Sequence, residues 1–151
     1  MAWRERLAEL GIELPAVPAP AGAYVPAVRS GSLVFTAGQV PFVNGKLAGT
    51  GKVGAEIGPD EAKQHARTCA LNALAAVDAL VGIDAVVRVV KVVGFVASAE
   101  GFTGQPTVLN GASEVLGEIF GDAGKHVRSA VGVAELPLGV PVEVELVVEV
   151  A

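Results

Sequence analysis

Residues 142–150 alternate between two kinds of side chain over the full length of a β-strand. Valine and leucine occupy positions 142, 144, 146, 148 and 150, whereas Glu143, Glu145, Val147 and Glu149 lie between them. Because neighbouring side chains of a strand point to opposite faces, this segment needs one buried face and one more polar face. The chain must therefore build a β-sheet that is covered on one side.

Two helices are expected to provide that cover. Gly58-Pro59-Asp60-Glu61 places a proline in a first helical turn and acids at the positive end of the helix dipole. Gln105-Pro106 opens a second helix, which runs to Phe120 and has Gly121 as its C-cap. The first helix carries small apolar residues at helical spacing and ends at Gly82; the stripe comprises Ala62, Ala66, Cys69, Ala73, Ala76, Val77 and Leu80.

Two side chains on the first predicted helix could carry chemistry, and both are interpreted as structural. His65 is expected on the exposed side of the helix, as a surface histidine rather than a metal ligand. Cys69 falls on the apolar stripe and is expected to be a small core residue rather than a nucleophile.

The remaining strands follow from β-branched and aromatic runs. Residues 32–40 predict one strand, and Asn44-Gly45 predicts a hairpin turn between Phe42-Val43 and Lys46-Leu47. Residues 86–96 are apolar on both faces, which predicts a central strand. Two strands joined by a Pro/Gly corner end the chain. This order predicts an α+β fold, a mixed sheet with two main helices on one face, whose other face is bare and apolar.

The N-terminal segment is expected to differ from the rest. Residues 2–11 mix charges of both signs and predict a short amphipathic helix ending at Gly11, not a signal peptide. Pro15, Pro18 and Pro20 then predict an extended arm. We therefore expect residues 1–20 to form a helix and a proline-rich arm, and residues 21–151 to form one domain.

Composition narrows the classes of function. The 151-residue chain is 52% hydrophobic, yet no apolar run reaches the roughly 18 residues of a membrane span. This excess of apolar residues indicates burial between subunits. The net charge of −5 disfavours nucleic acid as a partner. A single cysteine, Cys69, excludes an intramolecular disulfide and favours a reducing compartment such as the cytoplasm.

Arg128 is the leading candidate for a binding residue, because its run is otherwise built mainly from small and aliphatic side chains. The planar fork of an arginine matches a carboxylate, and a glutamate such as Glu143 could move protons beside it. The alternative is a structural ion pair between Arg128 and Glu143 or Glu145. Glu145 and Glu149 are interpreted as parts of a solvated face. The direction of any pKa shift at Glu143 stays open, because burial would raise it and a nearby arginine would lower it.

These residues also carry a family resemblance. Arg128-Ser129-Ala130-Val131, then Leu136-Pro137-x-Gly139 and Val142-Glu143-Val144-Glu145, is similar to the C-terminal signature of the RidA family, also called the YjgF or L-PSP endoribonuclease family. Near the N-terminus, Gly22-Ala23-Tyr24 resembles the family's Gly-Pro-Tyr segment, and Ala37-Gly38-Gln39-Val40-Pro41 resembles its Ser-Gly-Gln-x-Pro strand end. The resemblance extends from about Ala21 to the C-terminus.

The resemblance implies a chorismate-mutase-like fold, a homotrimer and ligand clefts between subunits. It assigns Arg128 to the carboxylate clamp, Glu143 to the positioning or activation of water, and Tyr24 and Asn110 to the pocket. It also places the backbone around Ala130 in the substrate's hydrogen-bonding shell. From the residues alone, Tyr24 could equally be an ordinary packing residue. Asn110 could belong to a polar helix face that also contains Ser113, Glu114 and Glu118.

The chain departs from the family pattern at three positions in this region. Ala37 stands where a serine is common, Ala130 where a cysteine is common, and Pro26 where a polar residue is common. These changes predict a more apolar pocket that accepts different or bulkier side chains.

Three functions are compatible with these residues and motifs. The leading hypothesis is hydrolytic deamination of reactive 2-enamine or 2-imine acids to 2-oxo acids and ammonia, without a metal or cofactor. The second is a trimer that binds small acids without catalysis. The third, less favoured by the acidic balance, is an endoribonuclease or translation inhibitor.

Overall fold

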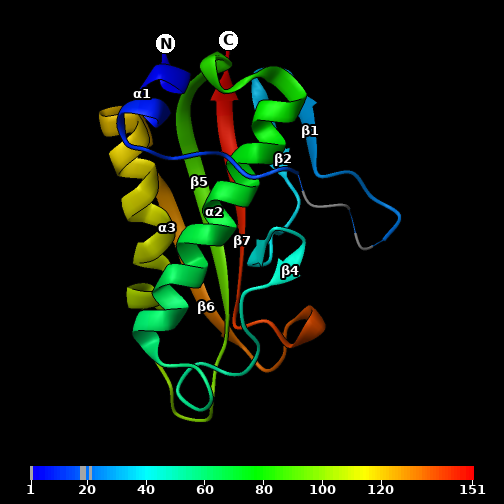
Figure 1. Cartoon of the computed structure of the whole chain (residues 1–151), viewed down its shortest axis with the longest axis vertical. Helices are drawn as coiled ribbons and strands as arrows, with labels where there is room; N and C mark the ends of the chain where they lie inside the picture. The colour runs from blue at the N-terminus through cyan, green and yellow to red at the C-terminus, as the bar shows by residue number, and fades with distance from the viewer. Residues whose placement is uncertain (1, 18–19, 21) are drawn as a thin grey trace.

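A five-stranded mixed sheet forms the centre of the computed structural model, which describes residues 2–17, 20 and 22–151. The order of its strands is β1-β2-β7-β5-β6 (Figure 1). Their bounds are Ala27–Ser30 for β1, Leu33–Thr36 for β2, Val86–Ala97 for β5, Val127–Val133 for β6 and Val142–Val150 for β7. Neighbouring strands are antiparallel except β5 and β6, which run parallel.

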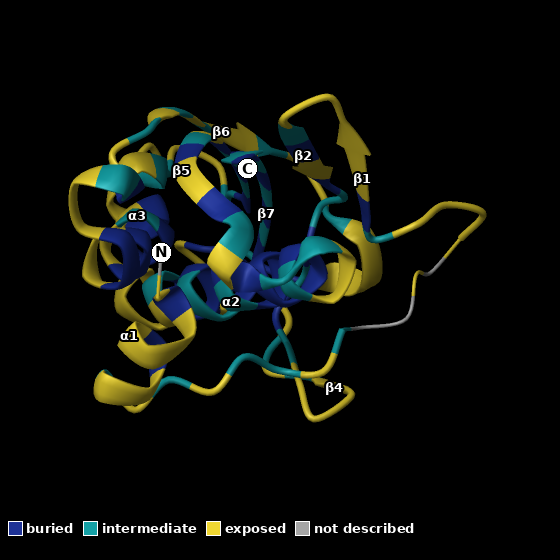
Figure 2. Ribbon diagram, turned by 90° about the horizontal axis from the view of Figure 1, so that it is seen from above, coloured by how far each residue is buried: buried dark blue, intermediate teal, exposed yellow. Residues whose placement is uncertain are grey.

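Two long helices, α2 (Pro59–Val81) and α3 (Gln105–Phe120), pack together on one face of the sheet (Figure 2). Both begin with a proline in the first turn and end at the glycines expected from the sequence, Gly82 and Gly121. α3 also joins β5 to β6, and such a crossover is what a parallel pair of strands requires. The predicted α+β fold is confirmed.

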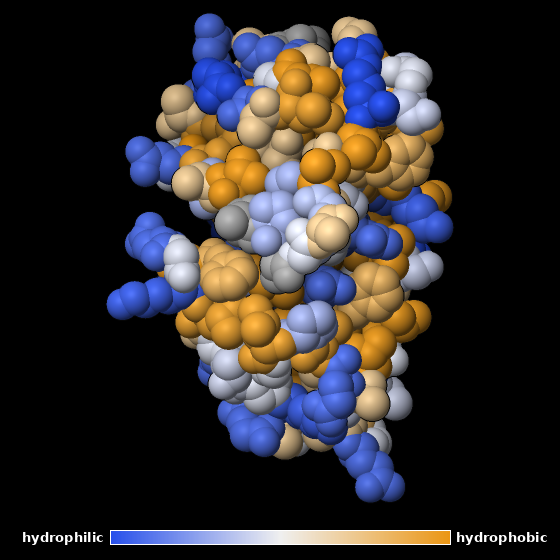
Figure 3. All heavy atoms as spheres, turned by 90° about the vertical axis from the view of Figure 1, so that its right-hand side faces the viewer, coloured by the Kyte–Doolittle hydropathy of each residue, from blue (hydrophilic) through white to orange (hydrophobic). Residues whose placement is uncertain are grey.

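The alternation along β7 divides the two faces of the sheet. The valines and the leucine at positions 142, 144, 146, 148 and 150 are buried beneath the helices, whereas Glu143, Glu145, Val147 and Glu149 are half-buried on the opposite face. That open face continues onto Phe35 and Val131, both of them exposed. Figure 3 shows apolar side chains forming much of the surface on the β1 side of the molecule, among scattered charged groups. β5 lies between β6 and β7, so its interior position is confirmed.

In the N-terminal half, β1 was not predicted from the sequence, and β2 is shorter than predicted. The strand predicted over residues 32–40 ends at Thr36, because the chain turns away toward Pro41 and only Gln39 still bridges to Val144. β1 pairs with β2 to form the main-sheet hairpin. The hairpin predicted at Asn44-Gly45 is confirmed as β3 (Phe42–Val43) and β4 (Lys46–Leu47), but it forms a separate two-stranded sheet.

The last two strands are not neighbours, although they follow one another in the chain. β5 lies between β6 and β7 in the sheet. The connection from β6 to β7 contains a short 3₁₀ turn at Pro137–Gly139. This arrangement separates the side chains of β6 from those of β7 by one strand.

Two expectations about α2 are wrong. His65 is only 7% exposed, because the loop around Gly49 packs over this side of the helix. Its Nε2 lies 3.1 Å from Glu61 Oε2. Leu80 is exposed, since it lies near the end of α2. Cys69 is fully buried as expected, and this burial raises the pKa of its thiol well above the ordinary value.

The N-terminal helix α1 (Trp3–Glu9) packs on its own chain. The indole of Trp3 donates a hydrogen bond to Val86 O at 2.7 Å and meets the Phe120 ring edge-on, with centroids 5.0 Å apart. Residues 12–17 follow without helix or strand, and Ile12, Leu14 and Val17 among them pack against the core. Pro18 of the predicted arm lies outside the described residues. None of the helices in the described part of the chain has both the length and the apolar character that a membrane span needs.

Candidate functional site

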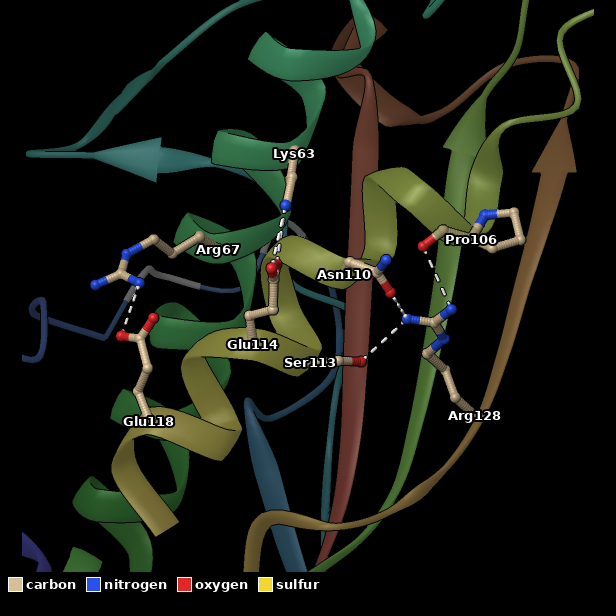
Figure 4. Close-up of polar contacts among 8 residues, drawn as sticks. All are labelled: Lys63, Arg67, Pro106, Asn110, Ser113, Glu114, Glu118 and Arg128. Atoms are coloured by element: carbon tan, nitrogen blue, oxygen red, sulfur yellow. Dashed lines mark hydrogen bonds and ion pairs between the residues drawn. The ribbon is translucent and has the colours of Figure 1, made fainter. Parts of the chain in front are cut away.

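Arg128 lies near the start of β6 and points toward α3 (Figure 4). Its Nη1 donates hydrogen bonds to Asn110 Oδ1 at 2.9 Å and to Ser113 Oγ at 3.1 Å, and its Nη2 donates to Pro106 O at 3.3 Å. All three acceptors are uncharged. A guanidinium has five N–H donors, so two remain beyond these contacts, which is the number that a bidentate carboxylate accepts.

One turn of helix explains how these partners meet the guanidinium. Asn110 and Ser113 are three residues apart on α3, so their side chains lie on one face of the helix. Glu114 and Glu118 also belong to the polar side of α3, but they pair with Lys63 and Arg67 of α2 (Figure 4). Asn110 is therefore part of a polar helix face and at the same time a direct partner of Arg128.

The expected alternative of an ion pair between Arg128 and Glu143 or Glu145 is wrong. Both glutamates lie on β7, with β5 between them and β6. They also point to the open face, whereas Arg128 points to the face that carries the helices.

A second group of residues surrounds a hollow of about 430 Å³ beside the start of β7. Tyr24, 49% exposed, and Glu143 both line it. The other lining residues are Pro20, Pro26, Gly38, Gln39, Val40, Phe42, Pro137 and Leu138. Among these described residues Glu143 is the only carboxylate, and most of its neighbours in the lining are apolar.

Glu143 is held in a setting that favours its neutral form. Its pKa is raised from the ordinary value, first because burial disfavours the charged carboxylate and second because Glu145 repels it. Within one chain, the arginine that would oppose this shift lies on the other face of the sheet. The carboxyl group is therefore suited to exchanging a proton closer to neutral pH than an ordinary glutamate.

Gly38 and Gln39 contribute to this hollow and were not among the expected site residues. A Cβ on Gly38 would come within 2.8 Å of Glu143 Cδ, so a larger residue there would displace the Glu143 carboxyl group from its present position. Gln39 fixes the segment, since its backbone N–H donates to Val144 O at 2.8 Å and its carbonyl accepts from Val144 N at 3.0 Å. The Gly-Gln pair of the Ala37–Pro41 motif could have identified both residues from the sequence.

Ala37 and Ala130, the two alanines that depart from the family pattern, lie in different parts of the structure. Ala130 follows Arg128 on the same face of β6 and pairs with Gly94. Ala37 lies next to Gly38, where its backbone N–H donates to Pro26 O at 2.8 Å. The expected site residues therefore form two groups. Arg128, Asn110 and Ala130 lie at the β6–α3 edge. Tyr24 and Glu143 line the hollow, and Ala37 precedes Gly38 of its lining.

These two groups lie on opposite faces of the sheet. In the strand register Phe95 stands opposite Glu143 on β7 and opposite Val131 on β6, so Glu143 and Val131 share the open face. Arg128 occupies the other alternate set of β6 positions. Within the described residues, no three His, Cys, Asp or Glu side chains are grouped so that they could hold a metal ion.

Comparison with known proteins identifies the fold and the family. Residues 4–150 match the family model described as "YjgF/chorismate_mutase-like, putative endoribonuclease". The protein TCP17 of Trypanosoma cruzi is 44% identical over 145 residues, which cover 95% of this chain and 91% of TCP17.

Two crystal structures extend the comparison. One from Shewanella oneidensis, described as a "putative endoribonuclease", has a TM-score of 0.93 at 34% identity and covers 98% of this chain and 99% of its own. TdcF of Escherichia coli, solved with bound serine, has a TM-score of 0.66 at 25% identity and covers 89% of this chain and 94% of its own. With nearly its whole length matched by the family model, the chain belongs to the YjgF family, as a divergent member.

Proposed function

We propose that this protein hydrolyses reactive 2-imino acids, and their 2-enamine tautomers, to 2-oxo acids and ammonia. In this reaction water adds to the C=N carbon, and the C–N bond then breaks to release ammonia and leave a C=O group. The observation that carries the proposal is the state of Arg128, which three neutral acceptors hold while two of its donors remain. A substrate carboxylate on those donors would orient the imine carbon for attack.

We further propose that the site forms between two copies of the chain, in a homotrimer. Arg128 with Asn110, and Tyr24 with Glu143, lie on opposite faces of the sheet, so a site that uses both groups needs two chains. The exposed apolar residues of the open face support such an assembly, because apolar surface of this kind favours burial between subunits.

Glu143 supplies the proton transfers in this proposal. As a carboxylate it would accept a proton from the attacking water, and as a carboxylic acid it would give that proton to the nitrogen. A second transfer of the same kind would move the proton of the newly added hydroxyl to the nitrogen as the C–N bond breaks, so ammonia leaves with both protons of the water. Its raised pKa supports the role, because a general acid–base group works best when its pKa is close to the working pH. The reaction itself calls only for water and these proton transfers.

A structural neighbour favours the same class of ligand. TdcF was solved with bound serine, a small molecule with a carboxylate. This observation supports an acid-binding site in the present chain. It also keeps a second candidate function, a trimer that binds small acids without turning them over.

The test is ammonia and 2-oxo acid release from freshly generated 2-imino acids, above the uncatalysed rate. We expect turnover, with a preference for apolar side chains because Pro26 and Phe42 line the hollow. Arg67→Ala is a matched control that removes an arginine paired with Glu118, away from Arg128 (Figure 4). It is expected to keep wild-type activity. Binding of 2-oxo acids without any turnover would favour the second candidate.

The pH dependence of this turnover is expected to reveal the influence of Glu145 on Glu143. Activity should fall as the pH drops through the raised pKa of Glu143, because the protonated acid cannot accept a proton from water. Glu145→Gln removes the second cause of the raised pKa and should move the midpoint of the acid limb to lower pH. The measurement is kcat/KM from pH 4 to 8 (roughly the span of shifted carboxyl pKa values). An unchanged midpoint would contradict the assignment.

A further inference from the structure

Arg128 has a partner whose own environment is unusually well defined. Ser113 Oγ lies 3.1 Å from Arg128 Nη1 and 2.9 Å from His126 Nε2, and His126 Nδ1 lies 2.6 Å from Gly124 O. The three side chains come from α3, from β6 and from the residue just before β6. They connect the guanidinium to the backbone of the 3₁₀ turn Gly121–Gly124.

The direction of each hydrogen bond follows from what the groups can do. A carbonyl oxygen only accepts, so the Nδ1 of His126 must carry the proton that is donated to Gly124 O. In the neutral imidazole Nε2 is then an acceptor, and it receives the hydroxyl proton of Ser113. The lone pairs of Ser113 Oγ are left to accept from Arg128, which has no acceptor of its own.

This directed series makes Ser113 a better acceptor than an isolated serine. Donating its proton to His126 polarises the hydroxyl, and successive hydrogen bonds in a chain strengthen one another. The fixed position of Oγ also limits the rotation of the guanidinium, which Asn110 holds at the same Nη1 and Pro106 holds at Nη2. The two remaining donors of Arg128 thereby keep one orientation.

From this geometry we infer that Ser113 and His126 are positioning residues that orient Arg128 for a carboxylate ligand. The inference rests on the proposed function, because it concerns how the same arginine meets its substrate. It adds two residues, neither of which the resemblance assigns to the site. Neither of them touches the substrate, since both act through the guanidinium.

The kinetic test compares variants that keep or remove one hydrogen bond. Ser113→Ala removes the acceptor for Arg128 and should raise KM for 2-imino acids about tenfold, as expected for one hydrogen bond to a charged group. Ser113→Thr keeps the hydroxyl and should stay within about twofold of the wild type. Thr68→Ala, which removes a hydroxyl bonded to Gln64 O within α2, is the matched control and should leave KM unchanged.

His126 is tested by the same logic. His126→Leu leaves the Ser113 proton without its acceptor and should raise KM severalfold, about as far as the loss of a neutral hydrogen bond allows. His126→Gln places an amide oxygen where Nε2 stood and should rescue most of the effect. A purely structural role for His126 would lower stability in both variants without separating their KM values, so circular dichroism melts accompany the kinetics.

Nitrogen NMR separates a failure of this inference from a failure of the proposed function. The chain has two histidines, so the ring signals of His126 can be assigned against those of His65. We expect the Nδ1–H tautomer at His126 and hindered, separate Arg128 Nη signals in the wild type, with those signals merging in Ser113→Ala.

Each outcome decides one question. Wild-type protein that neither binds nor turns over small acids would overturn the proposed function. In that case, merged Arg128 signals in Ser113→Ala would still support the positioning role, and unchanged signals would overturn it. Active wild type with unchanged KM in both Ser113→Ala and His126→Leu would overturn the inference while leaving the proposed function intact.

Discussion

Arg128→Ala and Glu143→Gln proteins are each expected to lose at least about 99% of imine turnover. When the two variants assemble together, we expect about a quarter of the wild-type activity to return. The losses follow because the first variant has no carboxylate clamp and the second has no group to accept a proton from water. The recovery follows from the separation of the two residues on opposite faces of the sheet.

The arithmetic of mixed assemblies sets the size of the recovery. Each proposed cleft uses Arg128 from one chain and Glu143 from its neighbour. In a random mixture of equal amounts, the first chain carries Arg128 in about half of the clefts and the second carries Glu143 in about half, so about a quarter contain both. This fraction holds for any closed ring with one cleft at each interface.

The measurement is the specific activity of the two variants after they are co-expressed or refolded together. Native mass spectrometry establishes that mixed assemblies have formed. A double variant, Arg128→Ala with Glu143→Gln, provides the control, because its mixture with Glu143→Gln contains no cleft with both residues and should stay inactive. Mixed assemblies of the two single variants without recovered activity would contradict a site shared between chains.

Gly111→Ala is expected to destabilise the protein by at least about 3 kcal/mol. A Cβ on Gly111 would lie 1.9 Å from Lys63 O and 2.9 Å from Lys63 C. These are backbone atoms of α2, so no side chain can turn aside to make room. The two helices would have to separate, and the packing between them and onto the sheet would be lost.

A second glycine of the same helix supplies the control. Gly117 is exposed and has nothing within 4 Å of the position of an added Cβ. Gly117→Ala should therefore stabilise the protein by about 0.5–1 kcal/mol, the usual gain in helix propensity. Urea unfolding of both variants provides the comparison, and a Gly111→Ala protein as stable as Gly117→Ala would show that the helices can adjust.

Helix α2 illustrates which features could be predicted locally. Its proline start, its glycine end and its small apolar stripe follow from rules that act within a few residues of one another. The burial of His65 could not be predicted in this way. That side of the helix is covered by the loop around Gly49, and nothing in the helix itself indicates a distant loop.

In the candidate site, too, some residues could be predicted from the sequence, but one predicted contact was wrong. Arg128, Glu143 and Tyr24 could be named from their motifs and Asn110 from its position on the second helix, and the structure shows Asn110 bonded to Arg128. The ion pair between Arg128 and a β7 glutamate was a reasonable expectation for two consecutive strands. It fails because β5 is inserted between them, and strand order depends on long-range pairing.

Patterns along the chain predicted the two faces of β7, the two covering helices and the family, because side-chain period, capping and motif spacing are local properties. The tertiary structure alone decided that Arg128 and Glu143 lie on opposite faces, that His65 is buried, and that Ser113 and His126 stand behind the arginine. The physical reason is that strand order and helix docking depend on which distant surfaces exclude water together, and no short segment carries that information.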